Sequence, residues 1–226
     1  MSVRSKRYTA NREKVSGEAV GLVEAVGIIK SFDKGGFDES VECVLNLNID
    51  PKQADQMVRG SISLPNGIGR QNKVIAFCQD DKEVETAKEA GAVEAGCDEL
   101  IEKVSGGWMD FDVAIASVRV MSKVGKLGRI LGPQGKMPSP KNGTVTQDVA
   151  GAVSEFKAGK AEFRNDAGGN VHLVVGKQSF EETKLAENIN AFISHIEKMK
   201  PASSKGHYMK GVYLSTTMSP SVSVAL

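Results

Sequence analysis

Hydrophobic and polar residues alternate over Val41 to Ile49, where only Val44 interrupts the polar side. A period of two residues predicts a β-strand with one buried face. Residues 59–64 are predicted to form its partner strand. The stretch after Ser16 is predicted to be helical, with an apolar face made of Val20, Val23 and Val26.

The middle of the chain differs, because it contains two short runs of uninterrupted apolar residues, Val74 to Cys78 and Val113 to Ala116. Such runs are typical of parallel strands that are covered on both faces. Helices are predicted around them, over residues 83–90, 98–104 and 121–131. Strands that alternate with helices indicate a small layered α/β domain.

Alternation returns in the last third, where strands are predicted at residues 161–164 and 171–175 around a turn at 166–169. Ser179 and Glu182 form a capping-box pattern that opens a long helix, and Pro201 closes it. Two further strands are predicted at residues 208–217 and 222–226. The helix has one apolar stripe, formed by Leu185, Ile189, Phe192, Ile196 and Met199.

The first and last thirds of the chain share the alternating pattern of half-buried strands, whereas the middle does not. The simplest interpretation is that one domain is inserted into another. We therefore expect a two-domain α/β (α+β) protein, with one domain formed by residues 1–67 plus 160–226 and the other by residues 68–159. The segment from Pro65 to Gly69 predicts a hinge-like linker, and the return crossing is expected near residue 159. The expected hinge glycines are Gly67, Gly69 and Gly159.

The composition fits a folded protein, since 40% of the 226 residues are hydrophobic, 25% are charged and the formal net charge is +1. This balance argues against a disordered chain and a uniformly basic nucleic-acid coat. The three cysteines lack Cys-x-x-Cys spacing, which argues against a disulfide scaffold or a structural zinc site. No secretory signal or membrane span is predicted, so a cytoplasmic protein is expected.

Two windows of the sequence contain basic residues and no acidic ones. One follows Glu197 and the other lies between Asp112 and Asp148. Unopposed basic stretches suit a surface that contacts phosphates, and solvated lysines are the common alternative. The second window contains Arg119, Lys123, Lys126, Arg129, Lys136 and Lys141.

The loop from Gly132 to Gly143 is the densest local signal, because long loops with glycines, prolines and lysines are often functional. Its spacing does not fit a Walker loop. Gly125-Lys126-Leu127-Gly128 matches the Gly-x-x-Gly clamp of a KH module, which is weak evidence alone. Two alternatives follow: a nucleotide-binding α/β enzyme that uses residues 132–143, and a KH-like RNA module within residues 68–159. The enzyme lacks a recognisable nucleophile, base or metal set, and His195 is interpreted as structural.

Phe37 lies in a polar loop after two glycines, where an aromatic ring either stacks on a base or plugs the core. Residues 214–220 place hydroxyl groups and a methionine at a strand end. They suit contacts with phosphate, ribose or base edges, or they simply finish a sheet edge. His172 points either to the core or to a ligand.

Six stretches that cover nearly the whole chain carry a family resemblance: FDESVE (37–42), DPKQADQMVRGSISLPNGIG (50–69), GGWMDFDVAIA (106–116), VGKLGRILGPQGKMPSPKNGTVT (124–146), EFRNDAGGNVH (162–172) and STTMSPSV (215–222). Through them the sequence resembles the bacterial type of the L-one family, large-subunit ribosomal proteins of the mobile rRNA stalk. The resemblance implies an rRNA-binding domain made of both chain ends and a Rossmann-like inserted domain.

The resemblance also implies a function and a set of partners. The expected protein is not an enzyme, needs no cofactor and is a monomer when free. It is expected to bind the stalk of large-subunit rRNA near the tRNA exit site and to aid release of deacylated tRNA. It is also expected to repress its own operon by binding an rRNA-like mRNA site. Recognition is expected to use RNA shape and ribose-phosphate contacts.

Carried onto this sequence, the family pattern implies RNA-binding residues at Phe37, Ser40, Glu42, Asp166, His172, Thr217, Met218 and Ser219. A secondary RNA contact of the inserted domain is expected at Lys126, Arg129, Lys136 and Lys141. Two positions depart from the pattern, since Ser219 replaces a usual glycine and Gly211 replaces a usual serine. A side chain at 219 is expected to hinder backbone approach or restrict a positive φ, and position 211 loses a hydroxyl.

Overall fold

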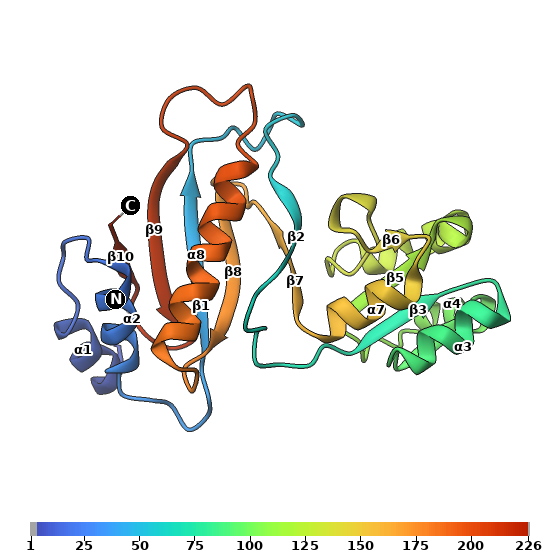
Figure 1. The fold of residues 1–226 in the computed structure, drawn as a ribbon, viewed down its shortest axis with the longest axis horizontal. Helices are drawn as coiled ribbons and strands as arrows, with labels where there is room; N and C mark the ends of the chain where they lie inside the picture. Colours follow the sequence, from blue (N-terminus) through green and yellow to red (C-terminus); the bar gives the residue numbers. More distant parts are fainter. Residues whose placement is uncertain (1–3, 226) are drawn as a thin grey trace. The chain divides into compact units, whose positions relative to one another are not determined.

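The chain folds into two compact units, which a computed structural model describes over residues 4–225 (Figure 1). The terminal unit contains the described residues up to Gly69 and from Ala161 onward, and the inserted unit spans Arg70–Lys160. Both units combine helices and strands, so the predicted two-domain α/β class is confirmed. The chain crosses between the units at Gly69–Arg70 and at Lys160–Ala161.

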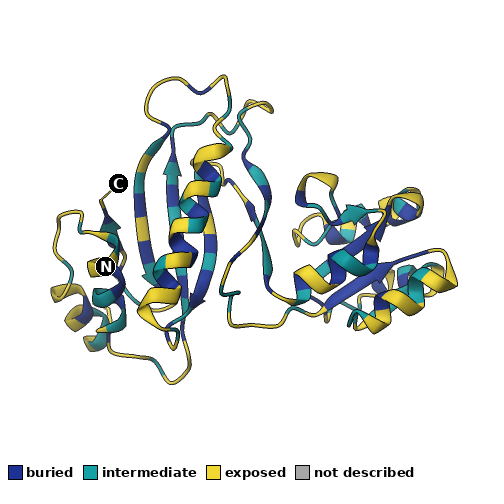
Figure 2. Cartoon of the chain, in the orientation of Figure 1, coloured by how far each residue is buried: buried dark blue, intermediate teal, exposed yellow. Residues whose placement is uncertain are grey.

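The terminal unit is built on a four-stranded antiparallel sheet with the strand order β10-β9-β1-β8. Its strands are β1 (Ser40–Leu47), β8 (Asn170–Lys177), β9 (Met209–Thr216) and β10 (Val222–Val224). The predicted alternation of β1 is confirmed, because every second side chain is buried (Figure 2). Helices α2 (Leu22–Lys30) and α8 (Glu182–Lys198) pack on this buried face (Figure 1).

The N-terminal helix α1 (Lys6–Glu13) is attached to the terminal unit by polar contacts rather than by an apolar face. The side chain of Asn11 is buried, and its Oδ1 accepts a hydrogen bond from Asp33 N (2.9 Å) while its Nδ2 donates to Asp33 O (3.3 Å). Just after the helix, Lys14 Nζ donates to Ser31 O (2.8 Å). These contacts fix α1 beside the loop that leads into β1.

Two predictions for the terminal unit are wrong. Strand β2 (Arg59–Ser63) does not pair with β1 but with β7 (Lys160–Arg164), because β8 and β9 already occupy both edges of β1. In helix α2 the buried residues are Ala25, Val26 and Ile29, whereas Val23 is 72% exposed. The prediction assumed a spacing of three residues, whereas the buried face follows the 3.6-residue period of the helix.

Helix α8 confirms the predicted apolar stripe but not the predicted capping box. The residue at the N-cap is Glu181, whose side chain makes no capping hydrogen bond. The Ser179 hydroxyl donates instead to Asp38 Oδ2 (2.8 Å), which connects the start of α8 to the loop before β1. The stripe residues Leu185, Ile189, Phe192 and Ile196 are fully buried.

The inserted unit contains a four-stranded parallel sheet with the order β4-β3-β5-β6. The strands are β3 (Val74–Phe77), β4 (Glu94–Gly96), β5 (Val113–Ser117) and β6 (Val145–Thr146). The helices are α3 (Asp81–Glu89), α4 (Asp98–Ser105), α5 (Met121–Val124), α6 (Gly128–Leu131) and α7 (Val149–Lys157). Ile75 and Phe77 pack in one core while Val74 and Ala76 pack in the other, so the sheet is covered on both faces as predicted.

The predicted helix at residues 121–131 is interrupted by a 3₁₀ turn at Gly125–Leu127. Gly125 and Gly128 both have right-handed helical backbone angles, so the Gly-x-x-Gly sequence forms helical turns and no KH-type clamp loop. Helix α7 was not predicted from the sequence, although its Val153 and Phe156 are fully buried. Within residues 4–225, no helix combines the length and apolar character needed to span a membrane.

Candidate nucleic-acid interface

The second face of the four-stranded sheet carries polar, aromatic and small side chains that are exposed or half-buried. The strand register places His172, Val44, Tyr213 and Ser223 in one row across the sheet. A neighbouring row contains Val174, Glu42 and Ser215. We call this surface the open face. Because side chains alternate along a strand, each buried core residue of β1 is followed by one that faces outward here.

One end of the open face carries two large exposed apolar side chains, Phe37 and Met218, each 53% exposed. They belong to two loops that are distant in sequence but are joined by hydrogen bonds between Ser40 and Thr217. Ser40 N donates to Thr217 Oγ1 (3.1 Å), and Thr217 N donates to Ser40 O (3.2 Å). The structure therefore brings four predicted residues into one cluster, and Phe37 does not plug the core.

The carboxylate of Glu39 joins these two loops, and Glu39 is only 2% exposed. Its Oε1 accepts from Gly35 N (2.9 Å), and its Oε2 accepts from Thr216 Oγ1 (2.6 Å) and Met218 N (3.2 Å). Burial alone would raise the pKa of Glu39, but these hydrogen bonds and the charge of Arg7 outweigh it and hold the pKa below its ordinary value. Glu39 is thus an ionised clamp between the loops.

Lys177 supplies a positive charge at the same end of the open face. Its Nζ donates to Ser40 Oγ (2.9 Å) and to Asp38 O (3.4 Å). This contact could not be predicted from the sequence, because a bulge between Val41 and Glu42 shifts the register of β1 against β8. Glu39 was also missed, since nothing in the sequence distinguishes a buried carboxylate from its exposed neighbour Asp38.

Asp166 lies at the opposite end of the open face, in the turn before β8. Its Oδ1 accepts from Gly168 N (2.8 Å) and Asn170 N (2.7 Å), while Oδ2 accepts from Asn170 Nδ2 (3.0 Å) and lies 3.6 Å from His172 Nε2. The hydrogen bonds from Asn170 are the main reason that the pKa of Asp166 is lowered to about 2. Glu42 and His172 lie between the two ends, so the predicted residues span the face rather than form one pocket.

The two positions that depart from the family pattern have specific local roles. Ser219 has no positive φ, like every other described non-glycine residue, so a glycine is not required there. Its hydroxyl accepts from Thr216 N (3.0 Å) and donates to Pro220 O (3.2 Å). Gly211 leaves space for an aromatic ring, because a Cβ atom at this position would lie 3.1 Å from Tyr213 Oη.

The basic window of the inserted unit is only partly free for contacts. Lys126, Arg129 and Lys141 are exposed and make no ion pair within residues 4–225. Lys136 donates instead to the carbonyls of Met109 (3.2 Å) and Phe111, and its ammonium lies 4.9 Å from the Phe111 ring centroid. These internal contacts use two of the three N–H donors of the Lys136 ammonium, so Lys136 has less capacity to bind a ligand phosphate than a fully exposed lysine.

The predicted hinge glycines are more firmly held than the sequence suggested. Gly67 O accepts from Asn188 Nδ2 (2.9 Å) of α8, which anchors the linker to the terminal unit. Gly69 has a φ of 72°, and a Cβ there would lie 2.8 Å from Phe180. Gly159 has a φ of 113° directly after the C-cap of α7, where left-handed glycine commonly ends a helix.

Fold and surface together define a two-domain α/β protein in which one face of the terminal sheet is exposed or half-buried. Residues 29–220 match the model of the ribosomal protein L1p/L10e family. The chain belongs to this family, whose members are structural ribosomal proteins and not enzymes. The enzyme alternative is therefore set aside.

The chain is also similar to known proteins over nearly its whole length. It is 51% identical to the large ribosomal subunit protein uL1 of a Nocardioides species over 98% of this chain and 92% of that protein. The uL1 protein of Protochlamydia amoebophila is 51% identical over 93% of this chain and 89% of its own length. The uL1 protein of Kosmotoga olearia is 49% identical over 98% of this chain and 96% of its own length.

Proposed function

We propose that the chain is a structural constituent of the large ribosomal subunit that binds the stalk of large-subunit rRNA, near the tRNA exit site, through the open face of the terminal unit. The observation that carries the proposal is the cluster of Phe37, Met218 and Thr217 held by Glu39. Exposed apolar side chains on loops that are held by backbone hydrogen bonds suit packing against bases and sugars. The family assignment and the large-subunit relatives support the same function.

The charges of the open face favour recognition of ribose and base edges over simple attraction of phosphates. Glu42 and Asp166 would repel phosphates but can accept hydrogen bonds from 2′-hydroxyl or base amino groups. Lys177 is placed for a phosphate at the end where the loops meet. Because the face carries both positive and negative charges, its binding depends on an RNA whose folded shape matches the positions of these charges. The formal net charge of the whole chain, only +1, likewise provides little general attraction for RNA.

The test is a binding titration of the full chain against the stalk fragment of large-subunit rRNA and a scrambled duplex, at several salt concentrations. We expect selective binding that Phe37→Ala, Met218→Ala and Thr217→Ala each weaken. Val118→Ala is the matched control, because Val118 is also 53% exposed but lies in the inserted unit. Equal binding to both RNAs with a steep salt dependence would mean nonspecific attraction and would contradict the proposal.

Repression of the chain's own operon follows from the same face, if an mRNA site reproduces the shape of the rRNA stalk. The two RNAs should then compete for one molecule of the protein, which we propose is monomeric when free. A competition titration with labelled stalk RNA measures this directly. Simultaneous binding of both RNAs would place the mRNA site elsewhere and refute a shared face.

A secondary contact with rRNA or exit-site tRNA is proposed for the inserted unit at Lys126, Arg129 and Lys141, without Lys136. We also propose that motion at Gly69–Arg70 and Lys160–Ala161 aids release of deacylated tRNA. These crossings follow the anchored Gly67 and the helix-ending Gly159. The test of the contact replaces Lys126, Arg129 and Lys141 together with glutamine. Ribosomes that carry this triple variant should release deacylated tRNA more slowly than wild-type ribosomes, and unchanged release would exclude the contact.

A further inference from the structure

A hollow of about 280 Å³ lies beside the open face, between helix α1 and strands β9 and β10. Tyr8 of α1 and Tyr213 of β9 both line it. Its wall continues through Pro220 and Ser221, directly after the turn that contains Thr217 and Met218. The hollow is therefore contiguous with the proposed RNA surface inside one unit.

The side chains around the hollow have the chemistry of a nucleotide site. Among the described residues that line it, none is acidic and Arg12 is the one with a charged side chain. Hydroxyl groups come from Ser221 and Ser223 in addition to the tyrosines. An arginine suits a phosphate, hydroxyl groups suit a ribose, and aromatic rings suit the face of a base.

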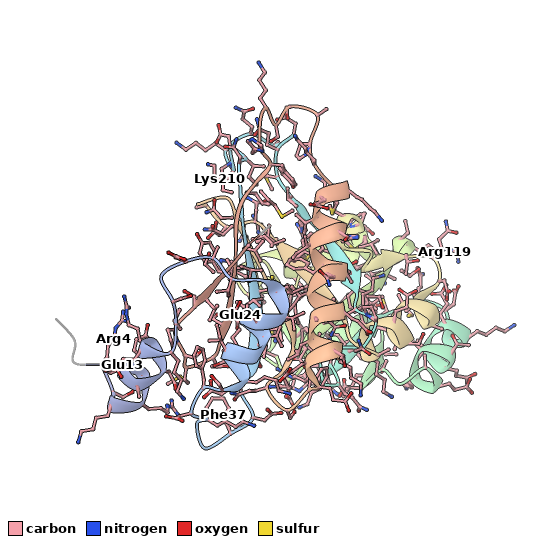
Figure 3. The ribbon with its side chains drawn as sticks, turned by 60° about the vertical axis from the view of Figure 1, so that its left-hand side comes forward. Arg4, Glu13, Glu24, Phe37, Arg119 and Lys210 are labelled. Atoms are coloured by element: carbon pink, nitrogen blue, oxygen red, sulfur yellow. The ribbon has the colours of Figure 1, made fainter. Side chains whose placement is uncertain are left out.

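Helix α1 turns one basic and aromatic side toward the hollow. Tyr8 and Arg12 are four residues apart on α1, and both line the hollow. Arg4 precedes the helix and does not line the hollow, and its guanidinium lies 4.4 Å from the Tyr8 ring centroid. Arg12 makes no side-chain hydrogen bond or ion pair within residues 4–225, whereas Asn11 anchors the helix to Asp33. Figure 3 shows Arg4 just before α1 and Phe37 in the loop before β1, both at the surface of the terminal unit.

The absence of a side chain at Gly211 determines where the Tyr213 ring lies. Residues 211 and 213 share one face of β9, and a Cβ at 211 would lie 3.1–3.3 Å from the Oη, Cε2 and Cζ atoms of Tyr213. The ring thus lies along the strand over the glycine and stays 40% exposed. A tyrosine ring in this position offers an exposed stacking surface for a base.

We propose that this hollow binds a single unpaired nucleotide of the RNA, with its base against Tyr8 and Tyr213 and its phosphate at Arg12. The inference rests on the proposed function, because it extends the same RNA surface onto α1. The volume of about 280 Å³ is just below the roughly 300–1,000 Å³ range of small-ligand sites, which suits one nucleotide and not a duplex.

The experiment titrates the full chain with the stalk fragment of large-subunit rRNA at several salt concentrations. Tyr8→Leu and Tyr213→Thr should each weaken binding about 5- to 100-fold, the range for loss of one base-stacking ring. Tyr8→Phe and Tyr213→Phe should retain binding, since they keep the ring. Arg12→Gln should reduce the slope of log Kd against log salt by about 1. Lys6→Gln is the matched control on the same helix, because Lys6 is exposed and does not line the hollow.

Ultraviolet crosslinking followed by mass spectrometry provides a readout that does not depend on stability. We expect RNA adducts on peptides that contain Tyr8 or Tyr213. The nucleotide site alone is overturned if the wild type binds the stalk selectively, its peptides with Tyr8 or Tyr213 carry no RNA adducts, and Tyr8→Leu and Tyr213→Thr bind as tightly as the wild type. An equal effect of Lys6→Gln and Arg12→Gln on the slope would also overturn it, in favour of diffuse attraction. If the wild type shows no selectivity, the proposed function fails first.

Discussion

Replacing Glu39 with glutamine should loosen both loops of the proposed RNA cluster without changing side-chain volume. The buried carboxylate accepts three hydrogen bonds, from Gly35 N, Thr216 Oγ1 and Met218 N. An amide has one acceptor oxygen, so in either orientation its NH₂ group faces a donor. At least one charge-assisted hydrogen bond of roughly 1.5–3 kcal/mol is lost, and we expect the free energy of unfolding of the terminal unit to fall by about 2 kcal/mol.

The pH dependence of this loss tests whether the charge of Glu39 is responsible. The pKa of Glu39 is lowered from an ordinary value of 4.5, so its contribution to stability is fully present above that value. The contribution is lost as the pH falls through the lowered pKa of the folded state. The difference in unfolding free energy between wild type and Glu39→Gln should therefore shrink below about pH 4.5. Asp166 is present in both proteins, so its own titration cancels.

The assay is urea denaturation with two signals, because the chain has one tryptophan, Trp108, and it lies in the inserted unit. Far-ultraviolet circular dichroism follows both units, and Trp108 fluorescence provides an internal control that should not move. Thr216→Val removes the partner hydroxyl, and a double-mutant cycle should give a coupling energy of about 1 kcal/mol or more. The reasoning would be refuted if Glu39→Gln left the urea transition of the terminal unit unchanged at pH 7, or if it lowered the free energy of unfolding by the same amount at every pH.

Three further substitutions test the packing that supports the surface. Asn188→Ala should destabilise the terminal unit by about 2–4 kcal/mol in urea, because it leaves the buried Val175 O and the part-buried Asn66 N and Gly67 O without their amide partner. Ser219→Gly should cost about 1 kcal/mol by the same assay, since the Thr216 N–H loses its acceptor and no strained φ is relieved. Phe156→Ala should lower the stability reported by Trp108 fluorescence by about 3–5 kcal/mol and leave the terminal unit unchanged.

The sequence predicted the parts of the fold that depend on local periodicity. The alternation of β1 and the apolar stripe of α8 were both correct, because one face of each element is buried continuously. The partner of β2 was wrong because strand pairing is decided by which edges remain free in the complete sheet. The capping box at Ser179 failed because a distant carboxylate, Asp38, takes its hydroxyl hydrogen.

The candidate site was predicted less completely, and mainly through family resemblance. The residue pattern alone left Phe37 open between the core and the surface, and the structure gives the exposed position. Lys136 and Lys141 are five residues apart in one basic loop, yet one binds internal carbonyls and the other is exposed. Formal charge cannot separate such residues, because the acceptors of Lys136 are backbone groups from a distant segment.

The buried polar groups near the interface indicate which parts of the chain stay fixed when RNA binds and which parts can move. Glu39 and Asn188 each connect segments more than a hundred residues apart, so the recognition loops and the linker are fixed by the folded unit itself. A surface organised before binding pays little entropy when RNA docks. We infer that the terminal unit changes little on binding RNA, so any large motion must occur at Gly69–Arg70 and Lys160–Ala161, where these anchors end.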